Sequence, residues 1–291
     1  MPRNVLREDE LDAPVSEIAK RSLRSGISGM SAMVVQVCSL MWMRTIMNYQ
    51  YRHGGQIKET VQKLYKEGGV RRFYRGLPVA LIQGPVSRFG DTFSNTLFLA
   101  FMNRSKQTRD LPTAVKTLGA SLTAATFRIF LIPIDATKTI MQVEGKQGLS
   151  ILKAKVKAGG PRVLYHGALA SASATFMGHY PWFTTFNILN GYLPKYESGV
   201  KKFARNGLIG FCASVISDSV SNSLRVIKTT KQTYQRPTTY PEVVKEIVNK
   251  DGVLGLMGRG LKVRIMTNGM QGLLFSILWN TFDEMFAKRG K

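Results

Sequence analysis

The chain repeats itself three times with a period of about ninety residues, and this repeat constrains its fold more than any other feature. In each copy, two glycines stand eight residues apart. The pairs are Gly68 and Gly76, Gly159 and Gly167, and Gly252 and Gly260. The second glycine recurs after 91 and then 93 residues.

A second marker follows the same period upstream of the glycines. Residues 39–45, 133–139 and 223–229 align with one another. Each segment ends in a basic residue followed by threonine, and the basic residues Arg44, Lys138 and Lys228 are 94 and 90 residues apart. Two independent markers that share one period indicate a genuine internal repeat.

Each repeat predicts the same order of helices. A long apolar-rich helix ends near the basic marker, and a short amphipathic helix precedes the glycines over 57–67, 149–158 and 240–250. The glycines end that helix, because they permit a tight turn. A second long helix then covers 77–104, 168–193 and 261–288. At about 1.5 Å per residue, such segments are long enough to cross a bilayer.

The long segments favour a membrane bundle over a soluble α-solenoid. A mean hydropathy of −0.06 is typical of a soluble protein, but helices that line a polar cavity keep polar residues on one face. Small residues, which let membrane helices pack closely, recur in these segments at Gly26, Gly29, Gly119, Gly207 and Gly210. Lysines gather around the short helices, as is expected beside an anionic leaflet.

The net charge of +23 requires an acidic partner. Nucleic acid, anionic lipid and an anionic solute all fit this charge. The basic residues are spread along the chain, and no nucleic-acid-binding motif is visible, so we expect lipid and solute and no nucleic acid. Glu8, Asp9, Glu10 and Asp12 argue against a cleavable transit peptide, because such peptides are poor in acidic residues.

With these residues the chain resembles the mitochondrial carrier family (solute carrier family 25 type). The segment Pro133-x-Asp135-x-x-Lys138, followed by Gly159 and Tyr165-x-Gly167, is similar to the family signature. The resemblance covers roughly residues 20–288. It implies an all-α membrane protein with six transmembrane helices in three tandem repeats, pseudo-threefold symmetry and three short matrix-side helices. We expect an N-terminal tail over 1–19 and repeats over 20–110, 111–198 and 199–291.

The resemblance also implies a location and a bound lipid. The chain is expected to be a multi-pass protein of the inner mitochondrial membrane. Cardiolipin is expected to bind near the starts of the short and even-numbered helices, where free N–H groups and the helix dipole attract phosphate. By position, Gly68, Gly159 and Gly252 belong to these lipid sites. No cofactor and no metal are expected.

The chain departs from the family pattern at the gate. Family members pair an acid and a base between neighbouring odd-numbered helices, but here the acid positions hold Met41, Asp135 and Arg225. The base positions hold Arg44, Lys138 and Lys228, so one carboxylate faces four cations. We expect Asp135 to pair with Lys228, and Arg44 and Arg225 to repel each other. At the opposite gate, Asn187 and Asn280 stand where the family has acids.

Solute contacts in the family lie about two turns after the second glycine. The resemblance places them here at Gln83, Gly84, Ser87, Arg88, Thr175, His179, Asn268 and Gln271. Arg88 is the one firm cation of this set, so a small anionic or zwitterionic solute fits better than a nucleotide. Other ionisable residues within the helices, including the pairs Arg88 with Asp91 and Asp218 with Arg225, indicate either neutral structural pairs or a solute site.

Two functions follow. The first is transport of a small anionic or zwitterionic metabolite across the inner membrane by alternating access. The alternative is a carrier-fold protein without transport activity, acting as a structural subunit of a larger inner-membrane complex such as a respiratory one; the missing gate carboxylates favour it. No catalytic constellation is visible, so an enzyme is not expected.

Overall fold

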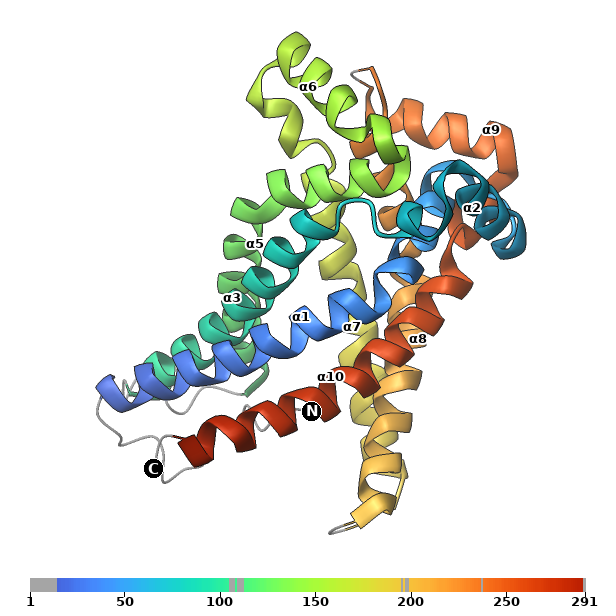
Figure 1. The fold of residues 1–291 in the computed structure, drawn as a ribbon. Coiled ribbons are helices and arrows are strands. Elements are labelled where there is room, and N and C mark those ends of the chain that lie inside the picture. The colour runs from blue at the N-terminus through green and yellow to red at the C-terminus, as the bar shows by residue number, and fades with distance from the viewer. Residues whose placement is uncertain are drawn as a thin grey trace. The chain divides into compact units, whose positions relative to one another are not determined.

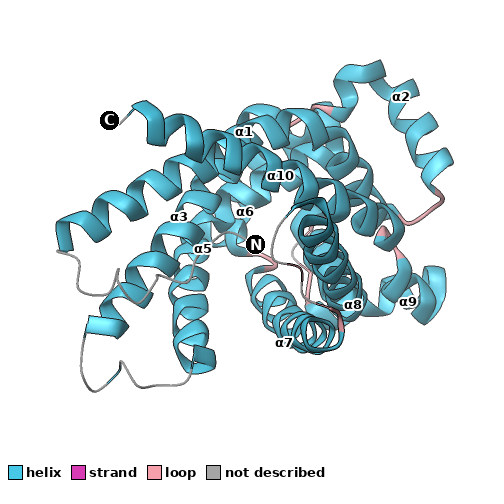
Figure 2. Ribbon diagram, turned by 90° about the horizontal axis from the view of Figure 1, so that it is seen from below, coloured by secondary structure: helices cyan, strands magenta, loops and turns pink. Residues whose placement is uncertain are grey.

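A computed structural model describes residues 15–104, 108, 113–194, 196, 199–236 and 238–289. For some positions inside these helices, among them 88, 91, 128, 179, 279 and 280, it describes the backbone and not the side chain. Within the described residues the chain is helical and has no strand (Figure 2).

Each repeat folds as a long helix, a short helix and a second long helix, as predicted (Figure 1). The long helices of the described chain are α1 (Val15–His53), α3 (Leu77–Arg104), α5 (Thr113–Glu144), α7 (Ala168–Tyr192), α8 (Gly199–Thr233) and α10 (Leu261–Arg289). The short helices are α2 (Ile57–Phe73), α6 (Gly148–Gly159) and α9 (Tyr240–Gly258), with 3-10 turns η2 (Gly145–Gln147) and η3 (Pro161–Tyr165) around α6. The predicted all-α fold in three repeats is therefore confirmed.

Local capping explains where α9 begins. Thr239 accepts a hydrogen bond from the backbone of Glu242, whose carboxylate accepts one from the backbone of Thr239 at 2.9 Å. This reciprocal pair satisfies two N–H groups that the first turn leaves free. Gln56 and Glu59 form the same arrangement before α2. Pro241 occupies the first turn of α9, where its missing N–H costs nothing.

The glycines end each short helix, as predicted. Gly69, Gly160 and Gly252 share a positive φ of 60°, 69° and 70° with an extended ψ. This backbone region is essentially restricted to glycine. Gly68 and Gly159, which the sequence alignment matched with Gly252, precede this turn. Repeat three thus has one more residue than the others between the turn and the second glycine.

Contacts divide the chain into two compact units. Unit 1 comprises residues 1–38, 80–131 and 274–291, and unit 2 comprises 39–79 and 132–273. In unit 1, Gly84 of α3 lies directly against Met33 and Val37 of α1. An added Cβ at Gly84 would be 3.1 Å from Val37 Cγ2. The close helix approach expected at Gly119 is also present, because an added Cβ there would meet the Phe98 ring of α3.

Unit 2 contains two apolar clusters. In the first, Leu64 and Phe73 of α2 pack with Ile46 and Tyr49 of α1 and with Val263 of α10. In the second, Val243 and Ile247 of α9 pack with Val226 of α8 and Tyr51 of α1. The apolar faces of α2 and α9 thus pack against α1, α8 and α10.

The second glycine of each repeat lies against the first long helix of another repeat. Gly76 lies against α5 near the carbonyl of Lys138, and Gly167 lies against α8 near the carbonyl of Lys228. Gly260 lies against α1, where an added Cβ would be 3.1 Å from the Met47 carbonyl. Repeat one thus contacts repeat two, repeat two contacts repeat three, and repeat three contacts repeat one. Within unit 2 these contacts form a closed threefold cycle.

A basic side chain from each repeat also binds carbonyls at the C-terminal end of the first long helix of another repeat. Arg72 donates to Gln142 O at 2.8 Å and to Val143 O at 2.7 Å. In the other repeats, Lys155 donates to Gln232 O at 2.8 Å and Arg259 donates to Arg52 O at 3.3 Å. A cation there satisfies carbonyls that the helix leaves free and opposes the negative end of its dipole.

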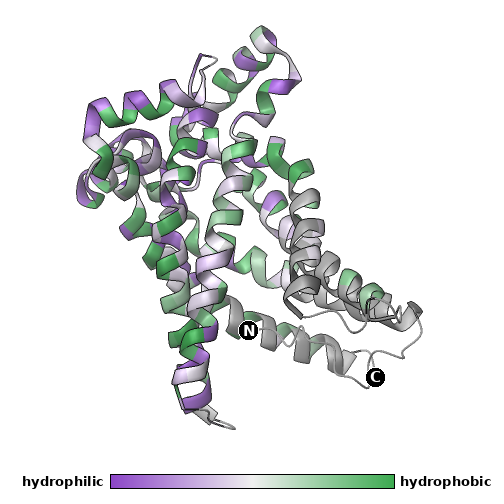
Figure 3. Ribbon diagram, turned by 180° about the vertical axis from the view of Figure 1, so that it is seen from behind, coloured by the Kyte–Doolittle hydropathy of each residue, from purple (hydrophilic) through white to green (hydrophobic). Residues whose placement is uncertain are grey.

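Hydropathy alone identifies one membrane span. Among the described residues, the helix segment Gly29–His53 is long and apolar enough to cross a membrane, with a mean hydropathy of 1.3. The shorter helix segment Leu77–Ser87 is apolar as well. Figure 3 shows why the signal is weak: hydrophobic and hydrophilic residues alternate along the long helices, and hydrophilic residues are frequent on the short ones. The membrane assignment therefore rests on the repeat rather than on hydropathy.

The packing role expected for the glycines of α8 is wrong. A Cβ added at Gly207 or Gly210 would have nothing within 4 Å, so these positions face open space. The close contact in this region is instead made by Gly178 of α7, where an added Cβ would be 2.9 Å from Ser217 Oγ of α8. Helices α7 and α8 lie side by side (Figure 1).

Candidate functional site

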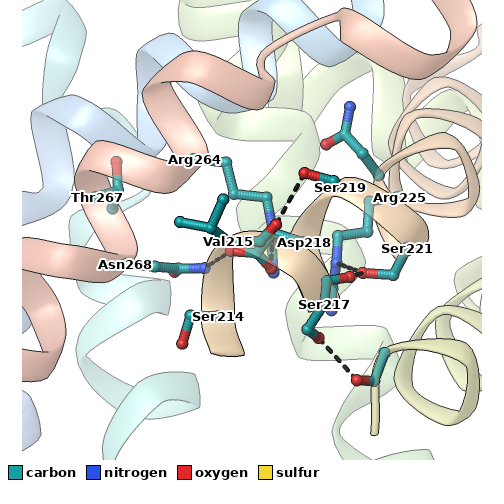
Figure 4. A network of polar contacts seen from close by, with 12 residues as sticks. Ser214, Val215, Ser217, Asp218, Ser219, Ser221, Arg225, Arg264, Thr267 and Asn268 are labelled. Carbon is teal, nitrogen blue, oxygen red and sulfur yellow. Dashed lines mark hydrogen bonds and ion pairs between the residues drawn. The ribbon is translucent and has the colours of Figure 1, made fainter. Parts of the chain in front are cut away.

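A buried ion pair joins α8 to α10 inside unit 2 (Figure 4). Arg264 Nε donates to Asp218 Oδ1 at 2.7 Å. Asn268, one turn along α10, donates its amide to Asp218 Oδ2. Both carboxylate oxygens are therefore engaged. Asp218 is 4% exposed, so its charge depends on these partners rather than on water.

Tyr51 extends this group to a third helix. Arg264 Nη1 lies 3.5 Å from the Tyr51 hydroxyl, which belongs to α1. Tyr51 is 2% exposed and packs in the second apolar cluster of unit 2. Residues Tyr51, Asp218, Arg264 and Asn268, called the α8–α10 network below, come from α1 of the first repeat and from α8 and α10 of the third.

A row of small hydroxyl side chains continues from this network along α8. Ser217 Oγ donates to the Gly178 carbonyl of α7 at 2.8 Å, and Ser221 Oγ donates to the Ser217 carbonyl at 2.8 Å. Arg225 Nε donates to Ser221 Oγ at 3.3 Å. Figure 4 shows this row beside Asp218. The side chains create a polar strip on a helix of membrane length.

Asp218 and Arg225, for which the sequence left open a neutral structural pair or a solute site, have different hydrogen-bond partners in the structure. The seven-residue spacing places both on related faces of α8, but Asp218 bonds across to Arg264 of α10, and Arg225 bonds to Ser221. Arg264 was missed because it lies only four residues after Gly260, outside the expected solute positions. The sequence feature that could have identified Arg264 is an arginine within a helix of membrane length, which by default indicates a functional residue.

The predicted solute residues fall in both units. Gln83, Gly84 and Ser87 lie on α3 in unit 1, where Gly84 is buried and the other two are half-buried. Thr175, Asn268 and Gln271 lie in unit 2 and are half-buried. Thr175 bonds to the Ser171 carbonyl at 3.0 Å, and Asn268 bonds to Asp218. The side chains of Arg88 and His179, and that of Asp91, lie outside the described part of the structure.

Two of the predicted gate cations, Lys138 and Lys228, meet around one carboxylate in unit 2. Asp135 of α5 accepts from Lys138 Nζ at 2.8 Å and from Lys228 Nζ of α8 at 2.7 Å. The predicted contact between Asp135 and Lys228 is therefore present. The side chains of Asp135, Lys138 and Lys228 are 15%, 13% and 21% exposed, so this charged group is largely removed from water.

Lys138 bonds to Asp135 of its own helix, and Met41 occupies the position at which the resemblance predicts a carboxylate partner on α1. In the carrier pattern Lys138 would meet a carboxylate on the first helix, but Met41 at that position is fully buried and offers a sulfur. Gln142 Nε2 donates to Met41 Sδ at 3.3 Å, and Asn48 donates to Gln142 Oε1 at 2.7 Å. Amide contacts thus join α1 to α5 where an ion pair is missing. The gate role of these residues stays a prediction.

Side chains of the opposite gate at positions 279 and 280 are outside the described structure, as are those at 93–96. Asn187 of α7 follows Phe186, whose ring stacks on Trp182 at 5.1 Å between centroids. Within the described residues, no three His, Cys, Asp or Glu side chains are grouped so that they could hold a metal.

Comparison with known proteins agrees with the repeat. The family model described as "Mitochondrial carrier protein" matches the chain three times, at residues 15–106, 109–197 and 199–290. Together the three matches span nearly the whole sequence. No curated protein matches the chain.

Proposed function

Because the chain belongs to the mitochondrial carrier family, whose model matches it in three consecutive repeats, we propose that it moves a small zwitterionic or anionic metabolite across the inner mitochondrial membrane by alternating access. The family is one of membrane transporters, so transport is the first function to consider. The chemical class of the solute is inferred from the residues of this chain.

The α8–α10 network supports this proposal and favours the zwitterion. Asp218 and Arg264 are a carboxylate and a guanidinium on facing helices, and Asn268 belongs to the predicted solute positions. A zwitterion such as an amino acid offers a carboxylate to Arg264 and an ammonium to Asp218. Such a solute exchanges one internal ion pair for two external ones, so no buried charge is left uncompensated when it binds.

Alternating access fits the way these contacts are made. Asp218 and Arg264 join α8 to α10, whereas Asp135 and Lys228 join α5 to α8. Movement of α8 relative to its neighbours must break one or both ion pairs. A solute that replaces the broken contacts lowers the cost of that movement, and this coupling is what a carrier requires.

The test is uptake by the full-length protein in proteoliposomes against a panel of amino acids, monocarboxylates, dicarboxylates and nucleotides. We expect saturable uptake of at least one amino acid and none of nucleotides. Uptake confined to dicarboxylates or nucleotides would contradict the zwitterion, and no saturable uptake of any solute by folded protein would contradict transport.

The missing gate carboxylates favour a second function, that of a structural subunit in a larger inner-membrane complex. Met41 and Arg225 occupy two of the three acid positions, so the ion-pair ring that closes a carrier is incomplete. Native electrophoresis of mitochondrial membranes in mild detergent separates the two functions. A free carrier migrates near 32.4 kDa plus its detergent, whereas a subunit co-migrates in fixed proportion with a much larger complex.

A further inference from the structure

Tyr51 reaches the α8–α10 network from the first repeat. Its hydroxyl accepts a hydrogen bond from Arg264 Nη1 at 3.5 Å, whereas Arg264 Nε donates to Asp218 Oδ1 at 2.7 Å. The Arg264 guanidinium is thus held by one contact within the third repeat and by one contact with the first repeat. The ion pair with Asp218 has a place in the proposed transport, and the contact with Tyr51 calls for an explanation of its own.

The Tyr51 ring is packed on several sides, so its hydroxyl has a fixed position. Tyr51 is 2% exposed, and it packs with Val226 of α8 and with Val243 and Ile247 of α9. The ring also lies against the turn at Gly260, where an added Cβ would be 2.8 Å from it. In so close a packing the ring cannot change its rotamer unless its neighbours move.

The contact between Tyr51 and Arg264 is not part of the threefold repeat. Tyr51 stands seven residues after the basic marker of its repeat, and Arg264 stands four residues after the second glycine. The other two repeats have Gly145 and Gln235 at the first of these positions, and Ala80 and Ser171 at the second. The repeated glycine contacts therefore do not require a tyrosine and an arginine here. The pair is specific to the interface that adjoins Asp218.

Tyr51 gains importance when a solute binds. In the proposed transport, the ammonium of a zwitterion takes Asp218, so the guanidinium of Arg264 gives up its Nε contact. The Tyr51 hydroxyl can still accept from Nη1, which leaves the other N–H donors of the guanidinium for the carboxylate of the solute. An arginine that is already held in place loses less side-chain entropy on binding than one that moves freely.

We propose that Tyr51 is a positioning residue for the solute, because its hydroxyl holds the Arg264 guanidinium in place for the solute's carboxylate. This role rests on the proposed transport, since it requires a solute that Arg264 binds. Loss of the hydroxyl should weaken binding of the solute. It should leave the fold and the rate of helix movement unchanged, because the ring and its packing remain.

Tyr51→Phe tests this role, because it removes the hydroxyl and keeps the ring. The purified full-length variant and the wild type are compared in proteoliposomes for uptake of glycine, alanine, serine and glutamate over a range of concentrations. For the amino acids that the wild type accepts, we expect the apparent KM to rise about three- to tenfold. The maximal rate should stay close to that of the wild type, and Tm in detergent should fall by no more than about 4 °C.

Tyr49→Phe is the matched control. Tyr49 belongs to the same helix, is 5% exposed and packs in the first apolar cluster of unit 2. This variant removes a tyrosine hydroxyl from α1 outside the α8–α10 network, so its KM should match that of the wild type. A rise in KM as large as that in Tyr51→Phe would overturn the proposal, because any loss of a tyrosine hydroxyl from α1 would then have the same effect.

Arg264→Lys tests whether Tyr51 acts through Arg264. Lysine keeps the positive charge but lacks the planar group that the hydroxyl orients. Adding Tyr51→Phe to Arg264→Lys should therefore raise KM by a clearly smaller factor than it does in the wild type. The same factor in both backgrounds would overturn the proposal. If Arg264→Lys takes up no amino acid, the comparison of Tyr51→Phe with Tyr49→Phe decides.

The possible results distinguish the role of Tyr51 from transport itself. Saturable uptake by the wild type with an unchanged KM in Tyr51→Phe would leave transport in place and overturn the role of Tyr51. A lower maximal rate at unchanged KM would overturn it too, because the hydroxyl would then act on helix movement rather than on binding. No saturable uptake of any of the four amino acids by the folded wild type would contradict both proposals.

Discussion

Asp218 and Arg264 lie 2.7 Å apart across α8 and α10, and Asn268 donates to the second oxygen of the same carboxylate. This contact links a residue of the predicted solute set to an ion pair that the sequence pattern did not indicate. It also ties two long helices of the third repeat together within unit 2. The burial and the helix-to-helix position of the Asp218–Arg264 ion pair determine what its loss should do to stability and to uptake.

Removing one partner of this ion pair should cost more than removing both charges. Arg264→Gln leaves the buried carboxylate of Asp218 without its cation, which typically destabilises a protein by about 3–5 kcal/mol. The double variant Asp218→Asn with Arg264→Gln keeps polar side chains of similar shape and no charge, so it should unfold near the wild type. Thermal unfolding in detergent measures both. Equal Tm values for Arg264→Gln and the double variant would contradict the role given to the ion pair.

Gly260 should not tolerate a side chain. Its φ is +66°, and an added Cβ would be 2.8 Å from the Tyr51 ring. Gly260→Ala should therefore lower stability by about 1–3 kcal/mol, through backbone strain and through loss of the contact between repeats three and one. The matched control is Gly207→Ala on α8, which has open space around it and should be neutral or slightly stabilising. Comparable Tm values for the two variants would show that Gly260 does not hold this contact.

Arg72 and Arg71 are adjacent, but only one of them binds a helix end. Arg72 is 4% exposed, bonds to Glu67 at 2.8 Å and donates to two carbonyls of α5. Arg72→Met leaves these carbonyls without their charged donor, and hydrogen bonds of this kind contribute about 1.5–3 kcal/mol each. Arg71 is exposed, so Arg71→Met should change Tm little. A larger loss in Arg71→Met than in Arg72→Met would reverse the assignment.

Lys155 should make stability depend on pH above neutrality. Burial lowers the pKa of its amine from the usual value of 10.5 to about 8, with further lowering from Arg52 and Lys231 against the opposing charge of Glu144. The folded protein then binds fewer protons than the unfolded chain between about pH 8 and 10.5. Stability from this group therefore rises with pH across that window and is flat below it.

The matched variant isolates this effect from the other titrating groups. Lys155→Met removes the amine, so the stability difference between wild type and variant should shift in favour of the wild type by about 3 kcal/mol from pH 8 to 10.5. Chemical unfolding at several pH values measures the difference. A difference that stays constant with pH, or that moves toward the variant, would show that Lys155 keeps its ordinary pKa when folded.

Helix order and length could be predicted from the sequence because glycine fixes them. The second long helices were expected to begin at 77, 168 and 261, and α3, α7 and α10 begin at these residues. Gly76, Gly167 and Gly260 all adopt a positive φ. Glycine adopts this backbone conformation far more readily than other residues, so the glycines in the sequence indicate where each turn lies. Because the glycines recur at nearly the same spacing, the helix start predicted in one repeat also predicts the helix starts in the other two.

Contacts between repeats could not be predicted in the same way. Arg72, Lys155 and Arg259 each bind the C-terminal end of the first long helix of another repeat. They occupy different positions within their own repeats, however. A long flexible side chain reaches the same carbonyl from several positions, so alignment does not identify it. Arg264 was missed for a similar reason, because its partner Asp218 is 46 residues away on another helix.

The glycine offset between repeats has a different cause. Aligning by the second glycine places Gly68, Gly159 and Gly252 together, whereas the left-handed turn occurs at Gly69, Gly160 and Gly252. The first two repeats have two adjacent glycines at this turn, and the second of each pair has the positive φ. The lipid site assigned to these positions stays a prediction, and substitutions that test it should be made at Gly69, Gly160 and Gly252.

Transport of a zwitterion through the α8–α10 network is tested most directly by uptake in the uncharged double variant. Asp218→Asn with Arg264→Gln is compared in proteoliposomes with the wild type and with Lys262→Gln, using the amino acid that the wild type accepts best. We predict that the double variant folds and loses saturable uptake by about ten- to a hundredfold, because each lost charged contact is worth a factor of ten or more. Lys262→Gln should match the wild type. Uptake by the folded double variant at the wild-type rate and affinity would contradict the account.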